Sequence, residues 1–536
     1  MATRGVEYGP PSMDKALGAL PVVAEFCRRL DIAGIVDRAS PVREVALLTH
    51  GQVIEALVAN RLTSPAPLVH VEDWARAWAV EEIFGIDPDA LNDDRIGRAL
   101  DAVAPKLGQI VGSVGVAAIA AFGIDVARLH WDMTSISLYG AYADAEEGFV
   151  EPRFGHPKDR RPDLKQVQAG LAVTGDGGVP VFHRAYDGGA GEVAQVVAAM
   201  EALRKIAGER KFLMVGDSKL VSYPNLAAMI DAGVGFIAPA SKTYVDAATL
   251  AAQDLAAATP VDYVAKRDAA KPPEARGRWR VTEDTMALAG PRKADPVLGL
   301  RRIFVWSSAR AGAAGAARAK KLDRAQDDLA RLERGLGGRH YPDAKAVEDR
   351  LAAIARDRRV KAYLRTEVRT DEAARPTLAW HFDDDALAAE AATDGWYALL
   401  TNLDPTDADA AEVLRRYKGQ EVVERRYGNF KGPIAVAPMF LKNNRRIEAL
   451  VTVICLALLI FSLVERALRL AIAPALTLAG LWAHRPAKPT GRLIFSALAR
   501  LRLIPATADT PAIVPQPPPL QARILELLDT DATRPR

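Results

Sequence analysis

The sequence predicts an α/β protein with a mixed sheet, preceded by an all-helical domain and interrupted by a β-containing insertion. Residues 14 to about 120 place apolar side chains at three- and four-residue spacing, which is the period of amphipathic helices. From Ala127 onward, segments rich in β-branched and aromatic residues alternate with amphipathic stretches. A charged segment after residue 240 separates two parts of this pattern, and we interpret it as the insertion.

Length and composition indicate several domains. The chain has 536 residues, more than the roughly 250–300 at which a single core stops growing, and 49% of them are hydrophobic. The predicted segments are a helical N-terminal domain (1–122), the first part of the α/β core (123–240), the insertion (241–392), the second part of the core (393–480), and a C-terminal segment with a loosely held, Pro-rich tail (481–536).

The N-terminal domain carries no signal of catalysis. One of its helices has a clear start signal, because Asn92-Asp93-Asp94 precedes an amphipathic run. DNA binding is one interpretation of this domain, and helical packing alone explains the pattern equally well. The first 15 residues lack the apolar stretch of a signal peptide. Cys27 and Cys455 lie far apart in apolar contexts, which suits a reducing cytoplasm rather than a disulfide framework.

The α/β core is predicted from the order of its elements. The expected elements are a strand (127–140), two strands (167–175 and 179–186), a helix (192–208), a short strand ending in Asp217, a helix (223–233) and a strand (234–240). Asp176-Gly177-Gly178 joins the second and third strands and is a strong hairpin signal. The order β-β-β-α-β-α-β, with the first three strands antiparallel, is that of the ribonuclease H-like fold.

The insertion is unusually basic. It combines short strands with a long charged helix at 313–336. Between Arg301 and Arg375 there are 19 Lys and Arg against 11 Asp and Glu, a local net charge of +8 in a chain whose total is +3. This asymmetry predicts a basic patch for a polyanionic partner, although a solvated helical face would also produce part of it.

One apolar run resembles a membrane span in composition but not in length. The uncharged stretch from Ala449 to Val464 has 16 residues, fewer than the ~20 that a spanning helix needs. Charged residues bracket it on both sides. We therefore predict a helix buried in the core and no membrane association.

Three carboxylates occupy informative positions in this order of elements. Asp132 lies in the first strand and Asp217 ends the fourth, and these strands are neighbours at the centre of a ribonuclease H-like sheet. Glu424 lies on a helix beyond the insertion that can pack across the sheet. Because three such close charges repel one another without cations, we predict two Mg²⁺ (or Mn²⁺) ions bound there, clamping a phosphodiester. Taken singly, each Asp is also explained as a turn former.

The helix that carries Glu424 is predicted to run unbroken from 411 to 431. Tyr417, Glu424 and Lys431 are spaced seven apart, so they fall within about 40° on one face, with Gln420 at its edge. A stripe of this kind presents one carboxylate beside a cation and hydrogen-bonding groups. A solvated helix face is the alternative interpretation.

The spacing of these four residues resembles a known signature. Tyr417, Gln420, Glu424 and Lys431 match the Tyr-x2-Arg-x3-Glu-x6-Lys pattern of one group of bacterial insertion-sequence transposases of the DDE type. Residues 160–189 also look like the corresponding segment of these enzymes, and the resemblance spans about 128–473. Gln420 departs from the usual Arg, and Lys418 or Arg425 are candidates to replace that missing cation.

The resemblance implies a DNA transposase that cuts transposon ends and joins them to target DNA by two-metal phosphoryl transfer. Asp132 and Asp217 would share one ion, and Glu424 would help to hold the second. Tyr417, Gln420 and Lys431 would form the DNA-binding face of their helix. The resemblance also implies a homodimer on terminal inverted repeats and target DNA, in the cytoplasm in association with the nucleoid.

Other functions remain open at this point. A catalytically silent DNA-binding protein derived from a transposase would keep the basic surfaces, and a ribonuclease H-like nuclease would hydrolyse DNA without strand transfer. Lys219, two residues after Asp217, is a weaker candidate for positioning phosphates and is more simply explained as a surface lysine. His130 and His183 are expected to be structural residues in strands. No GxxxxGK[ST] loop occurs, so the use of ATP or GTP is not supported.

Overall fold

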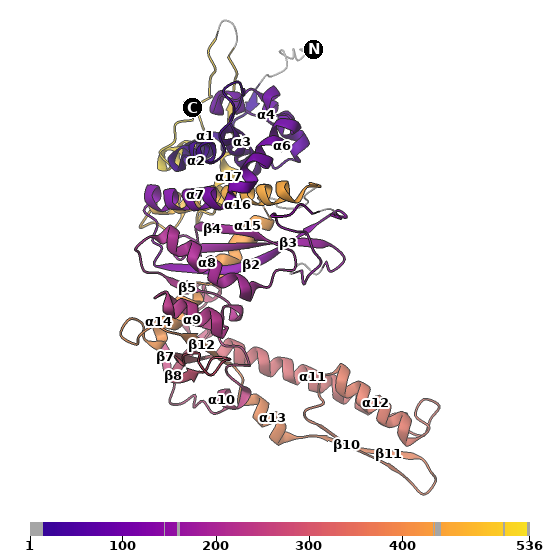
Figure 1. Ribbon diagram of the computed structural model, residues 1–536. Coiled ribbons are helices and arrows are strands. Elements are labelled where there is room, and N and C mark those ends of the chain that lie inside the picture. Colours follow the sequence, from indigo (N-terminus) through magenta and orange to yellow (C-terminus); the bar gives the residue numbers. More distant parts are fainter. Residues whose placement is uncertain are drawn as a thin grey trace, which may run out of the picture. The chain divides into compact units, whose positions relative to one another are not determined.

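The computed structural model describes residues 14–143, 145–157, 161–432, 434, 441–506 and 510–532. It divides into two compact units (Figure 1). Unit 1 contains Met1–Leu220, Ala228–Val234 and Gly419–Arg536, and unit 2 contains Val221–Ala227 and Gly235–Lys418. The predicted absence of a signal peptide falls on residues 1–13, which lie outside the described residues.

The first part of unit 1 is mainly helical. Its α-helices are α1 (Leu20–Leu30), α2 (Ile32–Ala39), α3 (His50–Thr63), α4 (Val71–Ala77), α5 (Val80–Phe84), α6 (Asp93–Val103) and α7 (Leu107–Phe122). The start signal of α6 is confirmed, because the Asn92 side chain accepts a hydrogen bond from the Arg95 N–H. These helices belong to the same compact unit as the first strands, so the predicted boundary at residue 122 falls inside unit 1.

The sheet of unit 1 is mixed and has the predicted order of pairing. β2 (Arg128–Leu138) pairs antiparallel with β3 (Lys165–Thr174), and β3 pairs antiparallel with β4 (Pro180–Tyr186). On its other side β2 pairs in parallel with β5 (Leu213–Val215). A parallel neighbour requires a crossover, and α8 (Glu192–Ala207) provides it between β4 and β5.

The predicted hairpin between β3 and β4 is confirmed. Gly177 and Gly178 have φ values of +77° and +65°, in the left-handed region where a residue without Cβ is favoured. At Gly178 a Cβ atom would also lie only 2.3 Å from a side-chain carbon of Val422. A larger residue there would push away the helix that contains Val422.

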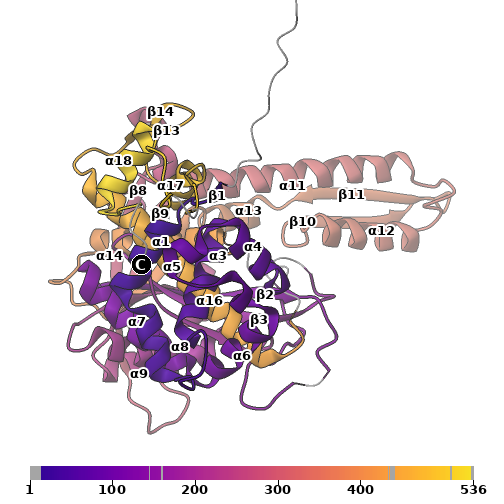
Figure 2. The ribbon, with the colours of Figure 1, turned by 90° about the horizontal axis from the view of Figure 1, so that it is seen from above.

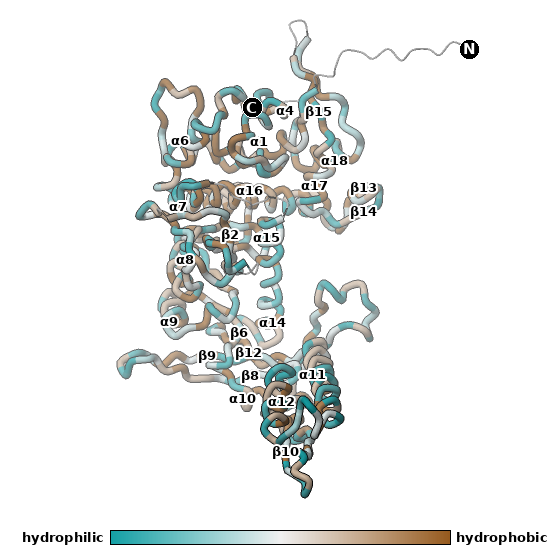
Figure 3. Tube along the Cα trace, turned by 90° about the vertical axis from the view of Figure 1, so that its right-hand side faces the viewer, coloured by the Kyte–Doolittle hydropathy of each residue, from teal (hydrophilic) through white to brown (hydrophobic). Residues whose placement is uncertain are grey.

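α16 (Asn444–Ala471) is the long apolar helix of unit 1. By length and composition alone it could cross a membrane, but 94% of its most apolar window is buried inside the protein. It packs against β4 on one side and against α3 and α6 on another, and its hydrophobic character is visible in Figure 3. The prediction of a helix buried in the core is therefore confirmed.

The C-terminal segment is more ordered than predicted. It contains β13 (Leu478–Trp482), β14 (Arg485–Ala487), α17 (Gly491–Leu498), β15 (Arg502–Leu503) and α18 (Pro519–Leu527). The prediction of a loosely held tail is wrong for α18, because this helix buries Ile524 and Leu525 and packs against α16 and α17. β15 pairs with β1 (Lys15–Ala16), which ties the described beginning of the chain to this segment.

Unit 2 is built on an antiparallel sheet. Its strands are arranged in the order β6 (Gly235–Pro239), β12 (Trp396–Thr401), β9 (Leu298–Ser307), β8 (Trp279–Leu288) and β7 (Thr259–Val261). α10 (Ala247–Ala251) and α14 (Ala410–Lys418) pack against these strands, and α9 (Tyr223–Asp231) is divided between the two units. β9 of the predicted insertion therefore pairs with β12, although β12 was predicted to begin the second part of the core.

An arm within unit 2 contains most of the basic segment Arg301–Arg375 together with the acidic start of a further helix. It consists of α11 (Ser308–Arg334), α12 (Ala344–Asp357), β10 (Leu364–Thr370), β11 (Pro376–Phe382) and α13 (Asp384–Ala391), arranged side by side in Figure 2. The arm has its own small core, in which Leu329 and Leu332 of α11 pack with Leu351 and Ile354 of α12.

Candidate functional site

Three carboxylates of unit 1 converge at one end of its sheet. Asp132, Glu192 and Asp217 each place one carboxylate oxygen so that all three oxygens lie within 4.8 Å of one another. Asp132 and Asp217 are partly exposed, whereas Glu192 is buried. We call these three residues the carboxylate cluster. Its members come from a strand, a helix N-terminus and a strand end, so the fold assembles them from distant parts of the sequence.

Strand register explains why the two aspartates meet. β2 and β5 are parallel neighbours, with His130 opposite Val215. Two residues further along each chain come Asp132 and Asp217, and parallel strands that advance together keep such residues level. The sequence-based prediction that these two side chains lie side by side is confirmed.

Glu192 was not among the predicted site residues. It is the first residue of α8, where a carboxylate is favoured by the helix dipole. Because β4 runs in the same direction as β2 and β5, the segment after β4 emerges at the same edge of the sheet as Asp217. An acidic residue at the start of the crossover helix was therefore a usable signal, which the prediction did not use.

Lys219 also lies at this site, although a surface lysine was the favoured of its two interpretations. Its Nζ lies 2.8 Å from Glu192 Oε2, and its backbone N–H donates to Asp217 Oδ1 at 2.8 Å. The hydrogen bond to Glu192 raises the pKa of Lys219, and the charges of Glu192, Asp217 and Asp132 add to this effect against the opposing effect of burial. The ammonium is thus a positive charge held against the carboxylate cluster.

The helix expected at 411–431 is broken. α14 ends at Lys418 and α15 (Glu421–Lys431) begins after a turn at Gly419 and Gln420. Glycine is the weakest ordinary helix former, because it loses the most backbone freedom. The prediction of one unbroken helix is wrong, so helical spacing no longer relates Tyr417 to Glu424.

Gln420 fastens the start of α15 to β2. Its Nε2 donates to the Trp131 carbonyl oxygen at 3.2 Å, and its Oε1 lies 3.0 Å from His130 Nδ1. Burial lowers the pKa of His130 to about 4, so the ring is neutral at pH 7 and its Nδ1–H can donate to the amide oxygen. Gln420 therefore uses its side chain inside the protein.

Tyr427 makes a second attachment beside the carboxylate cluster. Its buried hydroxyl lies 2.5 Å from the backbone oxygen of Asp132 and accepts the N–H of Leu171 at 3.1 Å. One side chain of α15 thus bridges β2 and β3 at the residue that carries a cluster carboxylate. Burial raises the pKa of Tyr427 well above its ordinary value, so the phenol stays protonated and able to donate.

Arg426 fixes the opposite side of α15. Its side chain is fully buried, with Nε and Nη2 donating at 2.6 Å to the backbone oxygens of Gly178 and Gly177. Nη2 also lies 3.2 Å from Glu465 Oε1 on α16. A buried guanidinium needs such partners, since removal of one of them leaves an uncompensated charge. These contacts hold α15 between the β3–β4 turn and α16.

Glu424 lies on α15 but outside the carboxylate cluster. It occupies the first turn, is exposed, and is not among the grouped carboxylates of the described residues. At ~100° per residue it shares an arc of about 60° with Gln420 and Tyr427, which both contact β2. The contacts of Gln420 and Tyr427 thus turn the face of α15 that carries Glu424 toward β2. The carboxylate of Glu424 is nevertheless not grouped with those of Asp132, Glu192 and Asp217.

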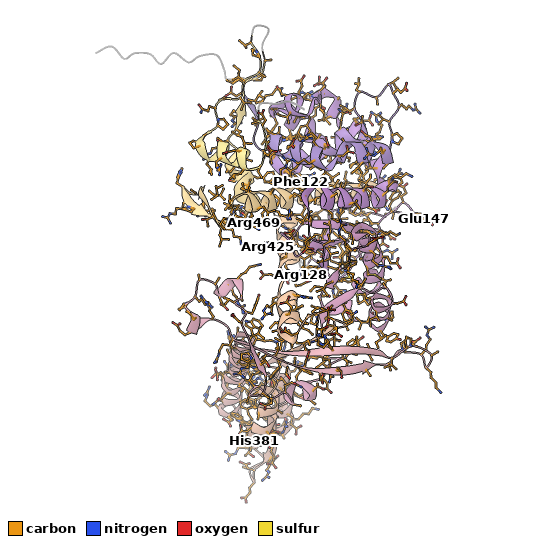
Figure 4. All side chains as sticks on the ribbon, turned by 90° about the vertical axis from the view of Figure 1, so that its left-hand side faces the viewer. Phe122, Arg128, Glu147, His381, Arg425 and Arg469 are labelled. Atoms are coloured by element: carbon orange, nitrogen blue, oxygen red, sulfur yellow. The ribbon has the colours of Figure 1, made fainter. Side chains whose placement is uncertain are left out.

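The remaining predicted residues lie in different places. Lys431 is exposed at the last position of α15. Tyr417 is the penultimate residue of α14 in unit 2, next to Lys418, whose Nζ lies 4.2 Å from the centre of the Trp279 ring. Lys418 is thus engaged with an aromatic ring, whereas Arg425 is exposed on α15 (Figure 4). Of the two cations considered as substitutes for the usual Arg, Arg425 is the more accessible.

The two strand histidines are buried, as expected for structural residues. His183 lies within β4 and burial lowers its pKa to about 3, so it is neutral at pH 7. It lies opposite Leu171 on β3, which in turn lies opposite Asp132 on β2. Neither His183 nor His130 belongs to a group of metal-ligating side chains in the described part of the chain.

The donor set of the cluster fits a hard divalent cation. Mg²⁺ and Mn²⁺ prefer carboxylate oxygens, and three of these lie close enough here to share one ion. Three carboxylates at this separation also need positive charge beside them, of which Lys219 supplies only one. Asp132, Glu192 and Asp217 are therefore the residues that would hold such a cation.

Comparisons with known proteins add little to this geometry. Residues 13–108 match a family described as a domain of unknown function, DUF4277, which lies outside the carboxylate cluster. No curated protein matches the chain. A cryo-EM structure of the piggyBac transposase synaptic complex with hairpin DNA aligns over 82% of this chain and 74% of its own, with 9% identity and a TM-score of 0.38. A likeness this weak carries no conclusion.

Proposed function

We propose that the chain is a DNA transposase of the DDE type, built on a ribonuclease H-like core. The observation that carries the proposal is the convergence of Asp132 on β2, Asp217 just after β5 and Glu192 at the start of α8. The strand order β4-β3-β2-β5, with only β5 parallel to its neighbour β2, supports the assignment of the core. The signature residues of α14 and α15 support the choice of a transposase among enzymes with such a core.

The proposed reaction is phosphoryl transfer in two steps. Hydrolysis of a phosphodiester frees a 3′-hydroxyl at the transposon end, and this hydroxyl then attacks a phosphodiester of the target, displacing its 3′-oxygen. A bound divalent cation supplies Lewis acidity and lowers the pKa of an attacking water. Asp132, Glu192 and Asp217 would hold that cation, and Glu424 is proposed to contribute to a second one. Lys431, Tyr417 and Gln420 were predicted to face DNA. The side chain of Gln420 is bonded to His130 and Trp131 inside the protein, so the exposed Lys431 is a better candidate than Gln420 for a contact with DNA.

The test uses linear DNA that carries the sequences flanking the reading frame. With Mg²⁺ or Mn²⁺ we expect cleavage at the ends and, on adding target plasmid, joined products. Full cleavage in excess chelator would contradict the proposal. Cleavage without joining would instead support the nuclease alternative, and DNA binding without either reaction would support the silent binding protein.

A prediction concerns the cations of the arm. Some are neutralised within the protein, since Arg318 pairs with both Asp394 and Glu390. Lys320, Arg324 and Arg334 of α11 are exposed and form no ion pair with any described residue. If they bind phosphates, replacing all three with Gln should reduce the log–log salt slope of DNA binding by about 0.9 for each phosphate that is no longer neutralised.

The matched control for this prediction lies on the same helix. Arg331 is exposed, but its guanidinium bonds to Asp328. Arg331→Gln should therefore change the salt slope less than any of the three substitutions above. Binding is measured by fluorescence anisotropy between about 50 and 200 mM salt, a range over which phosphate contacts dominate the affinity. An unchanged slope in the triple variant would mean that these charges only solvate the helix.

A further prediction concerns Lys431. As a point charge near the scissile phosphate it should position DNA, so Lys431→Ala should slow cleavage and weaken end binding, while Lys431→Arg is partly tolerated. The rate is measured with a pre-bound DNA end at saturating protein. If Lys431 is only a surface lysine, the free energy of unfolding should change by no more than ~0.5 kcal/mol and cleavage should proceed at the wild-type rate.

A further inference from the structure

The ammonium group of Lys219 lies against the carboxylate cluster. Lys219 Nζ lies 2.8 Å from Glu192 Oε2, and the side chain of Glu192 is only 6% exposed whereas that of Lys219 is 51% exposed. The buried carboxylate is thus reached from solvent by an ammonium on a flexible stem. The backbone of Lys219 is held in place because its N–H donates to Asp217 Oδ1. Its side chain remains half-exposed.

We propose that Lys219 is the resident counter-ion of the carboxylate cluster, and that a divalent cation must displace its ammonium from Glu192 in order to bind. The inference rests on the proposed function, because it assumes that the cluster binds metal. Lysine and metal compete for the same carboxylate, and their positive charges repel each other. Metal affinity is therefore limited by a competitor that belongs to the chain itself.

Two physical properties make the displacement feasible. Lys219 is half-exposed, so water solvates its ammonium when it leaves Glu192, while the arriving cation replaces its charge at the buried carboxylate. Lysine also carries a compact charge on four methylene groups, so its ammonium can swing into solvent without any movement of β5 or α8. Before metal binding, the same ammonium reduces the mutual repulsion of three carboxylates within 4.8 Å.

The first experiment measures Mn²⁺ affinity of the full chain without DNA, by electron paramagnetic resonance of the free ion. Lys219→Met keeps the length of the side chain and removes its charge, so it should bind Mn²⁺ about fivefold more tightly than wild type. Lys219→Arg should not gain affinity, because the charge is retained. Lys205→Met is the control, since this exposed lysine lies on α8 in the turn farthest from Glu192.

The second experiment uses the wild-type chain, so it does not depend on the folding of a variant. Lysines are acylated with acetic anhydride with and without saturating Mg²⁺, and labelled peptides are quantified by mass spectrometry. Release from Glu192 should increase the labelling of Lys219 several-fold and leave Lys205 unchanged. Equal labelling of Lys219 in both conditions would overturn the inference.

Affinity in Lys219→Met that is unchanged or weaker than in wild type would likewise overturn it. Asp132→Asn separates this failure from a failure of the proposed function. If wild type binds Mn²⁺ and Asp132→Asn does not, the metal site stands whatever Lys219 does. If both bind Mn²⁺ equally, the carboxylate cluster is not the metal site and the proposed function itself fails.

Discussion

Replacing Asp132 or Asp217 with Asn is expected to abolish metal-dependent DNA cleavage while DNA binding persists. Asparagine has nearly the same shape, so the strand register that brings β2 and β5 together should be kept. It lacks the negative charge that a hard cation requires, and only two of the three carboxylates remain. We expect the cleavage rate to fall by at least about a thousandfold, as when a central charge-stabilising element is removed.

The measurement compares cleavage in Mg²⁺ with DNA affinity in chelator. Asp231→Asn is the matched control, because Asp231 is an exposed aspartate at the end of α9. It should cleave at the wild-type rate. Substantial cleavage by either cluster variant would remove that residue from the chemistry. If a variant loses both DNA affinity and cleavage, a folding defect is the explanation, and thermal unfolding would reveal it.

The aspartate pair could be predicted because the order of the elements follows from local signals, namely alternating apolar runs, the Asp176-Gly177-Gly178 turn and a helical crossover. That order suggested a ribonuclease H-like sheet, in which the first and fourth strands are neighbours, and β2 and β5 are indeed paired. Once they are neighbours, residues at matching positions must meet. The buried α16 was predictable for a similar reason, since an uncharged run too short for a membrane belongs in a core.

Other features depend on contacts between distant residues and were missed. Lys219 looks like a surface lysine from its neighbours, and only the arrival of Glu192 from α8 gives it a partner. The break between α14 and α15 depends on Gln420 bonding to His130 and Trp131, which lie about 290 residues earlier. The helical period of 411–431 contained no sign of these tertiary hydrogen bonds.

Glu192 and Glu424 should differ sharply in their effect on metal binding in the absence of DNA. Glu192 is a buried member of the carboxylate cluster, whereas Glu424 is exposed and stands apart from it. Glu192→Gln should therefore weaken Mn²⁺ binding to the free protein by at least about tenfold. Glu424→Gln should leave that affinity within about twofold of wild type, because the first ion does not depend on it.

Cleavage should nevertheless fail in both variants if Glu424 joins the site only when DNA is bound. The control is Glu201→Gln, since Glu201 is exposed on the same helix as Glu192. Unchanged Mn²⁺ affinity in Glu192→Gln would exclude Glu192 as a ligand, and full cleavage by Glu424→Gln would leave the three-carboxylate cluster as the whole catalytic set. The sign of the effect also separates the two partners of the ion pair: removal of the Glu192 charge weakens metal binding, whereas removal of the Lys219 charge strengthens it.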